Sequence, residues 1–317
     1  MKFYSTNLIS LINALSVDSI KITELVLVSR RPRINDSIPY DNYHKFFQDT
    51  FSYASKISTY QKIAISRLEY SQYVESSVKP DFLDLSLEQS KFSHKRRIII
   101  SGSDAYCALG FINYSDYLLT KIKLEKSWKN AINFNDLNEY YMVGQPNIKS
   151  NQQNIYQINP KKIMNNLTYT SQLFQGKIFA NYNLDLNTKY LLLIPPQSRI
   201  SDTKFVKSFF EYANKISLEL ELKIIIKLHP NEDWVKFTKI VGIQNKYFSN
   251  HYSNIPVEFF FSIDNIKKII AAPSYSLSYV GLKDLEVLVP KNRKIFRKYF
   301  LDQLPFLNAN NISFKFI

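Results

Sequence analysis

The feature that most constrains this chain is a short apolar run that stops on a His-Pro pair. The run lies between Lys223 and Asp233 and reads K-I-I-I-K-L-H-P-N-E-D. Because it is rich in β-branched residues and too short to cross a membrane, it predicts a strand buried on both faces. Pro230 cannot donate to a sheet ladder, so the strand is expected to end there. His229 is therefore predicted at the carboxyl end of a central strand, where open α/β sheets bind their ligands.

A second apolar run, residues 266–272, stops at Pro273 and continues into the serine-rich stretch S-Y-S-L-S. This order predicts a strand, a proline-terminated turn and a helix that begins at Ser274 and Ser276. Backbone N–H groups and hydroxyls at a helix start can bind an anion, and simple capping by the serines is an alternative with the same geometry. One sheet end with an imidazole and one with a phosphate-sized anion site together favour an enzyme that binds a nucleotide-sugar phosphate.

Length and element order indicate two α/β domains. A chain of 317 residues, 45% of them hydrophobic, fits two domains of about 150 residues each. Strands and helices alternate in both halves, which predicts parallel sheets with right-handed crossovers. The expected fold class is α/β, with two Rossmann-like domains facing a cleft. The expected divisions are an N-terminal domain, a C-terminal domain and a basic C-terminal segment, at 1–165, 166–290 and 291–317.

The individual elements follow from local patterns. Strands are expected at 2–5, 24–28, 97–101, 190–194, 224–228 and 266–272, with a weaker candidate at 257–261. Helices are expected at 8–15 and 202–220, and a longer helical region at about 38–75. The stretch 150–166, rich in Asn, Gln, Lys and Pro, is expected to be the linker between the domains.

Several classes of protein are not expected. The single cysteine, Cys107, excludes an internal disulfide framework, and the four histidines show no metal-binding spacing, so no metal is predicted. Neither the dinucleotide fingerprint nor the P-loop occurs, which argues against dehydrogenases and P-loop ATPases and predicts no cofactor. The N-terminus lacks the pattern of a signal peptide, and no run of 18 apolar residues occurs, so a cytoplasmic location is expected.

The formal net charge of +14 has two explanations. Abundant Lys, Asn, Ile and Tyr with scarce Gly and Ala is the composition that an AT-rich genome produces without selection on function. However, five cations crowd the segment Lys291 to Lys298, between apolar residues. On a helix this pattern predicts either an apolar stripe packed on the protein with solvated cations, or a helix that lies on an anionic membrane surface. No nucleic-acid-binding motif accompanies the charge, so nucleic acid is not an expected partner.

The two motifs resemble those of a known family. The H-P at 229–230 and the P-S-Y-S at 273–276 look like the H-P and serine/threonine motifs of the bacterial lipooligosaccharide sialyltransferases and capsule polysialyltransferases, in the same order and with a similar spacing. The resemblance implies a fold of the GT-B glycosyltransferase type, a CMP-sialic acid donor and no metal. It further implies that His229 acts as the leaving-group acid at the CMP phosphate and that Ser274 and Ser276 bind the same phosphate.

The first half departs from that family. Its members carry a D/E-D/E-G motif whose carboxylate is the general base toward the acceptor, whereas this chain has Ser101-Gly102-Ser103 followed by Asp104. Asp104 is the candidate base from a shifted position, and a helix cap is the equal alternative. The remaining candidates lie on the donor side. A nearby carboxylate, Glu232 or Asp233, would raise the pKa of His229 and hold it in its protonated form. These donor-side candidates are Pro230, Gln197, Ser198 and Glu232.

Three hypotheses follow. The first is a metal-independent transferase that moves sialic acid, or a related ulosonic acid, from its CMP form to a glycan or glycolipid acceptor such as lipooligosaccharide or capsule, at the inner membrane face. The second is another transferase on the same scaffold, using a UDP-hexose or a CDP-polyol. The third is a glycan- or membrane-binding relative without catalysis. Release of CMP or UDP from the different donors separates the three.

Overall fold

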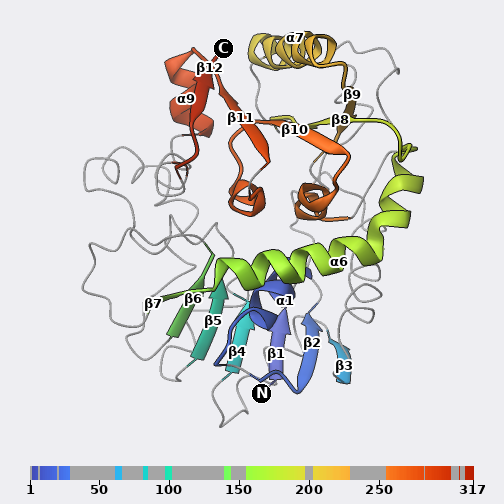
Figure 1. Cartoon of the computed structure of the whole chain (residues 1–317). Helices are drawn as coiled ribbons and strands as arrows, with labels where there is room; N and C mark the ends of the chain where they lie inside the picture. Colours follow the sequence, from blue (N-terminus) through green and yellow to red (C-terminus); the bar gives the residue numbers. More distant parts are fainter. Residues whose placement is uncertain are drawn as a thin grey trace. The chain divides into compact units, whose positions relative to one another are not determined.

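The chain forms two compact units, residues 1–166 and 167–317, in a computed structural model (Figure 1). The structure describes residues 2–5, 8–19, 21–28, 61–65, 81–84, 97–101, 139–143, 155–196, 203–228, 255–281, 283–300, 307 and 311–317. No described helix is long and apolar enough to span a bilayer. The α/β fold class predicted from the sequence is confirmed in both units, as the two sheets described next show.

The first unit is built on a parallel sheet with seven described strands in the order β3-β2-β1-β4-β5-β6-β7. This is the doubly wound Rossmann order, in which the strand sequence reverses between β1 and β4. Helix α1 (Leu8–Leu15) contacts β1 and β5. The strands are β1 (Lys2–Ser5), β2 (Glu24–Val28), β3 (Gln61–Ile65), β4 (Asp81–Asp84), β5 (Arg97–Ser101), β6 (Glu139–Met142) and β7 (Ile155–Gln157).

The second unit is built on a parallel sheet with five described strands in the order β12-β11-β10-β8-β9. Counted along the chain this is the 2-1-3-4-5 order, the other common doubly wound arrangement, and its reversal lies between β8 and β10. The strands are β8 (Tyr190–Ile194), β9 (Lys223–Ile226), β10 (Ile266–Ala271), β11 (Asp284–Val289) and β12 (Phe314–Phe316). The helices are α6 (Pro160–Asn181), which begins in the first unit, α7 (Thr203–Glu219), α9 (Arg293–Tyr299) and the 3-10 helices η3 (Val257–Ser262) and η4 (Tyr275–Tyr279).

Helix α7 covers one face of the second sheet (Figure 1). Phe205, Phe209 and Ala213 recur every four residues, which places them on one helical stripe, and all three are buried against the strands. The strand residues on this face include Leu193 and Ile224. Burying a large apolar side chain of this kind stabilises the fold by roughly 1.5–3 kcal/mol, so this cluster fixes the helix on the sheet.

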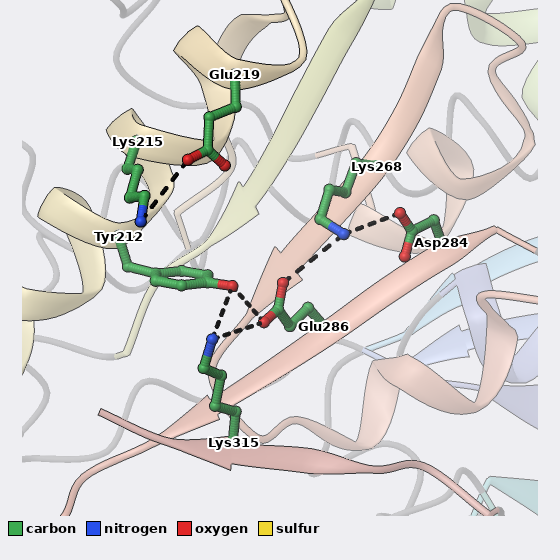
Figure 2. A network of polar contacts seen from close by, with 7 residues as sticks. All are labelled: Tyr212, Lys215, Glu219, Lys268, Asp284, Glu286 and Lys315. Carbon is green, nitrogen blue, oxygen red and sulfur yellow. Dashed lines mark hydrogen bonds and ion pairs between the residues drawn. The ribbon is translucent and has the colours of Figure 1, made fainter.

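A polar network ties α7 to the three strands farthest from β9 (Figure 2). The Tyr212 hydroxyl donates to the Glu286 carboxylate at 2.5 Å and accepts from the Lys315 ammonium at 3.2 Å. Lys268 bonds Asp284 at 2.8 Å and lies 3.7 Å from the second oxygen of Glu286. Asp284 is the first residue of β11, so the network starts at the amino ends of the strands, away from the edge where ligands bind.

Most of the predicted elements are confirmed. The strands expected at 2–5, 24–28, 97–101 and 190–194 and the helix expected at 8–15 occur at those bounds. The strand expected at 224–228 occupies 223–226, the strand at 266–272 occupies 266–271, and the helix at 202–220 occupies 203–219.

Three predictions are wrong in part. Residues 61–65, inside the region expected to be helical, form β3. The candidate strand at 257–261 is η3, in which Phe259, Phe260 and Phe261 are all buried. Three consecutive buried aromatic residues do not fit the two-residue period of a half-exposed strand, and an apolar run this short does not distinguish strand from helix. The expected linker at 150–166 contains β7 and the first turns of α6.

Candidate functional site

The carboxyl ends of β8, β9 and β10 form the edge at which a ligand is expected in the second unit. The strand order reverses between β8 and β10, and doubly wound sheets bind ligands at such a reversal. Backbone hydrogen bonds continue just past the strands. The Lys227 N–H donates to the Leu193 carbonyl at 2.9 Å, and the Ala272 N–H donates to the Ile194 carbonyl at 2.8 Å. The three strand ends are therefore held level with one another.

The serine turn lies directly after β10. Pro273 is buried, and Ser274 caps η4 with extended backbone angles. The Ser274 hydroxyl accepts a hydrogen bond from the Ser276 N–H at 3.4 Å. The prediction that a helix begins at these serines is confirmed, although the helix is of the tighter 3-10 type. Ser274 and Ser276 are half-buried, and their turn sits at the sheet edge where the strand order reverses.

A buried lysine lies at the end of β9. Lys227 is only 3% exposed, and its ammonium donates to the Leu228 carbonyl at 2.8 Å. Side chains alternate along a strand, so Lys227 shares a face with Ile225 and lies opposite the α7 core. Burial disfavours the charged form and lowers the pKa of Lys227 to about 8, while the negative charge of Glu258 opposes that shift.

A second buried ionisable group lies on η3. Glu258 is buried, and burial raises the pKa of its carboxyl group. Its own backbone N–H, the hydroxyl of Ser276 and the positive charge of Lys227 act in the opposite direction. An ammonium after β9, a carboxylate on η3 and a hydroxyl on η4 thus lie near enough for their charges and dipoles to affect one another. Such a set can bind an anionic group and can accept hydrogen bonds from sugar hydroxyls.

The structure brings together only part of the predicted site. Of the eight candidates, Ser274 and Ser276 are described and lie in one turn. The other six lie outside the described residues, so their roles remain predictions. They are His229, Asp104, Pro230, Gln197, Ser198 and Glu232.

Lys227 and Glu258 are functional candidates that sequence reasoning missed. The signal for Lys227 was a single cation in an otherwise apolar run, two residues before the H-P pair. Glu258 precedes three phenylalanines in a stretch expected to be a strand, where a carboxylate would have faced solvent. The electrostatic effect of each residue on the other depends on the tertiary structure, because they are far apart in the chain.

Within the part of the chain that the structure describes, no group of three His, Cys, Asp or Glu side chains is placed to hold a metal ion. Among the described residues, the ionisable groups at the carboxyl edge whose pKa is shifted are one lysine and one glutamate. The chemistry available from these described residues is therefore charge recognition and hydrogen bonding.

Comparison with known proteins finds similarity in fold and none in sequence family. No protein-family model and no curated protein sequence matches the chain. Among solved structures it is similar to an α/β-galactoside α-2,3-sialyltransferase from the luminous marine bacterium Photobacterium phosphoreum, with a TM-score of 0.54 and 13% identity, over 99% of this chain and 97% of that one. It also matches the E. coli heptosyltransferase WaaC with ADP, with a TM-score of 0.35 and 10% identity, over 98% of each chain. At 13% identity the first likeness bears on fold alone, and it agrees with the α/β class and the Rossmann-like sheets predicted from the sequence.

Proposed function

We propose that this chain is a glycosyltransferase that takes a nucleotide-sugar donor and a glycan acceptor. The observation that carries the proposal is the carboxyl edge of the second sheet, where the Ser274 turn follows β10 and the buried Lys227 follows β9, on the two sides of the strand-order reversal at β8. The likeness in fold to a sialyltransferase supports the choice of this class among doubly wound proteins.

The donor we propose is CMP-activated sialic acid or a related ulosonic acid. Support comes from the resemblance of the H-P and P-S-Y-S motifs to those of bacterial sialyltransferases. Transfer breaks the bond between the sugar and the CMP phosphate and forms a bond to an acceptor hydroxyl, so negative charge grows on CMP and a proton leaves the acceptor. Hydrogen-bond donors that are in place before the reaction stabilise that charge. The hydroxyls of Ser274 and Ser276 and the backbone N–H groups of their turn are suited to this role.

The remaining roles follow from the sequence. His229 would protonate or bind the leaving phosphate, and Asp104 would accept the acceptor's proton. Pro230, Glu232, Gln197 and Ser198 complete the proposed donor side. A lipooligosaccharide or capsule glycan is the proposed acceptor.

We further propose that transfer needs no metal and that the enzyme works at an anionic membrane surface. Ile295 and Phe296 pack against the core and Phe300 is buried, so the apolar stripe of the basic segment is used in folding. The exposed cations, Lys291, Arg293 and Lys294, remain available to anionic headgroups, which attract such residues by about 1 kcal/mol each. The attraction would dock the protein reversibly on the membrane surface, while Ile295, Phe296 and Phe300 stay packed in the protein and do not insert into the bilayer.

A donor panel tests the proposal. Purified protein is incubated with CMP-sialic acid, CDP-polyol or UDP-hexose, each with and without a lipid-linked glycan, and the released nucleotide is measured. We expect CMP release from CMP-sialic acid, stimulated by acceptor and unchanged by EDTA. Release of UDP that EDTA abolishes and Mn²⁺ restores would replace the proposal with a hexosyltransferase, and no release from any donor would leave a non-catalytic binding protein.

A further inference from the structure

Strand β12 leaves an aromatic side chain exposed at the carboxyl edge of the second sheet. Phe316 is the last residue of β12 and pairs with Val289, the last residue of β11, so it lies at the carboxyl ends of these strands. The residue is 48% exposed. Hydrogen bonds continue past it, because the Ile317 N–H donates to the Val289 carbonyl at 2.9 Å and the Ile317 carbonyl accepts from the Lys291 N–H at 3.0 Å. Phe316 is therefore presented to solvent by a hydrogen-bonded strand.

Phe316 belongs to a group of three contacting aromatic rings, which joins β12 to α9 (Figure 1). The centre of its ring lies 5.7 Å from that of Phe314, in an edge-on arrangement, and 5.8 Å from that of Phe296 on α9. Phe314 and Phe316 share one face of β12, whereas Lys315 between them lies on the other face, toward α7. Phe296 and Phe314 are half-buried, so packing fixes the group and leaves Phe316 as its most exposed member.

Exposed cations border this aromatic group. Lys291, Arg293 and Lys294 are all exposed, and they stand at the start of α9, where the first turn holds no acidic residue. Arg293 and Phe296 are three residues apart on this helix and are therefore neighbours on its surface. The carboxyl edge at β11 and β12 thus presents a large apolar ring beside several positive charges.

This combination fits the surface of an anionic bilayer better than a second copy of the chain. Segments that lie in a membrane interface combine Lys and Arg with Trp, Phe or Leu, and the cations are attracted by anionic headgroups. A second copy would bring the same cations against those of the first, and each copy carries a net charge of +14, so charge opposes self-association through this surface. Charge complementarity therefore favours an anionic bilayer as the partner.

We propose that Phe316, with Phe314 beside it, is the apolar anchor of a membrane-docking surface whose charged part is the start of α9, and that its ring enters the headgroup region of an anionic bilayer. The surface lies at the same edge of the sheet as the Ser274 turn, because β12 is two strands, or about 10 Å, from β10. A lipid-linked acceptor would thus arrive on the side where the donor is proposed to bind. The inference rests on the proposed function for the choice of a membrane-bound acceptor, and it adds an apolar contact to the docking by charge.

Flotation of the full chain with lipid vesicles is the first test. The vesicles contain phosphatidylcholine alone or with phosphatidylglycerol, and the salt concentration is 0.05 or 0.2 M. Phe316→Ser should bind the anionic vesicles roughly three- to tenfold more weakly than the wild type, because about half of the residue is exposed and can be buried in the membrane. This loss should be the same at both salt concentrations. The loss caused by Gln at positions 291, 293 and 294 should shrink as the salt concentration rises.

Leu218→Ser is the matched control. Leu218 is 81% exposed near the end of α7, the helix that leads into the start of β9, so it lies at the opposite edge of the same sheet. This change also removes a large exposed apolar side chain, and it should leave vesicle binding unchanged.

Fluorescence of Phe316→Trp is the second test, and it keeps an aromatic ring at the position. Anionic vesicles should shift its emission to shorter wavelength, and lipids brominated near the headgroup should quench it. Leu218→Trp should show neither effect. The chain contains two native tryptophans, so the spectrum of the wild type is subtracted from both. Thermal unfolding shows which variants are folded, and Phe316→Trp decides the question if Phe316→Ser is not.

The outcomes separate this inference from the proposed function. Equal flotation of the folded Phe316→Ser and the wild type, or no quenching of Phe316→Trp, overturns the anchor and leaves docking by charge. Equal binding to neutral and anionic vesicles overturns the part given to the cations. A dimer in sedimentation that Phe316→Ser dissolves would assign the ring to a second copy. Failure to float with any vesicle overturns the docking surface altogether, while nucleotide release in the donor panel still decides the proposed transfer.

Discussion

At the scale of single residues, His229 is the residue on which the proposed transfer most depends. Replacing it with alanine removes the acid that would assist departure of CMP, so we expect turnover to fall by roughly 10²-fold or more while the fold is retained.

Steady-state transfer assays and circular dichroism of His229→Ala check this expectation together. Near-full activity in a folded variant would reduce His229 to a residue that only ends a strand.

The buried lysine makes a separate prediction about stability. The pKa of Lys227 is lowered from 10.5 to about 8 on folding, so between these values the unfolded chain binds more protons than the folded one. The free energy of unfolding therefore rises with pH in this window, because the cost of burying the charge is relieved. We expect a gain of roughly 2 kcal/mol between pH 8 and 9.5, relative to Lys227→Met/Glu258→Gln.

Urea denaturation of both proteins at each pH measures the difference, which cancels the titration of groups common to the two. A difference that stays flat, or falls, would mean that Lys227 keeps its proton in the folded protein across this range.

At the scale of elements, α6 contains a glycine without a structural need for it. Gly176 lies well inside this 22-residue helix, and a Cβ atom built there meets no atom within 4 Å. Glycine in a helix interior costs about 0.5–1 kcal/mol relative to alanine. Gly176→Ala should therefore raise the free energy of unfolding by that amount, measured by urea denaturation at pH 7.5.

Gly281 provides the matched control, because its φ of 65° lies in the left-handed region. Alanine there should destabilise the protein by roughly 1 kcal/mol. Equal effects at both glycines would indicate that the two changes act mainly on the unfolded chain.

Helix α9 makes the second prediction at this scale. Asn292 caps it by accepting from the Lys294 and Ile295 N–H groups, yet its first turn holds cations and no acid, which the helix dipole disfavours. We expect the protein to float with anionic liposomes and not with neutral ones, and binding to weaken at high salt. Replacing Lys291, Arg293 and Lys294 with Gln should remove about 3 kcal/mol of this attraction.

The control removes the same charge from three exposed lysines outside α9, Lys177, Lys189 and Lys223. If both triple variants lose binding equally, the net charge of +14 accounts for the effect and α9 has no special part in it.

The elements also show what the sequence could and could not predict. β9 and β10 were predictable because a short, mostly apolar run with a proline close behind it has few other structures. The start of α6 carried its signal too, since Asn159 accepts from the Lys161 N–H at 3.0 Å and Pro160 takes the first helical position. The sequence nevertheless favours a linker here, because the first residues of this helix are polar and exposed. The helix start at the serine turn was predictable from its capping residues, whereas the burial of Lys227 was not, because it depends on elements that are distant in the chain.

At the scale of the whole molecule, two sheets with different strand orders each offer an edge for a ligand. The described polar groups of the carboxyl edge lie in the second unit, so CMP is expected to bind there. Hydrogen exchange with and without CMP should slow amides at the ends of β8, β9 and β10 and leave the strands of the first unit unchanged.

Mass spectrometry of peptic peptides gives the resolution needed, because the two sheets share no peptides. Protection confined to the first unit would move the nucleotide to the other Rossmann-like sheet and remove the basis for the donor side proposed here.

The placement of Lys315 has a consequence for self-association. β12 is the edge strand next to β11 and is three residues long, and Lys315 is its middle residue. An exposed strand edge invites pairing with another chain, and a charged residue on a short edge strand opposes it. The Lys315 ammonium lies 4.4 Å from the centre of the Tyr212 ring, so the side chain that links β12 to α7 also keeps a charge at this edge. A neutral residue at position 315 would weaken the contact between β12 and α7. It would also remove a charge that opposes aggregation through this strand edge.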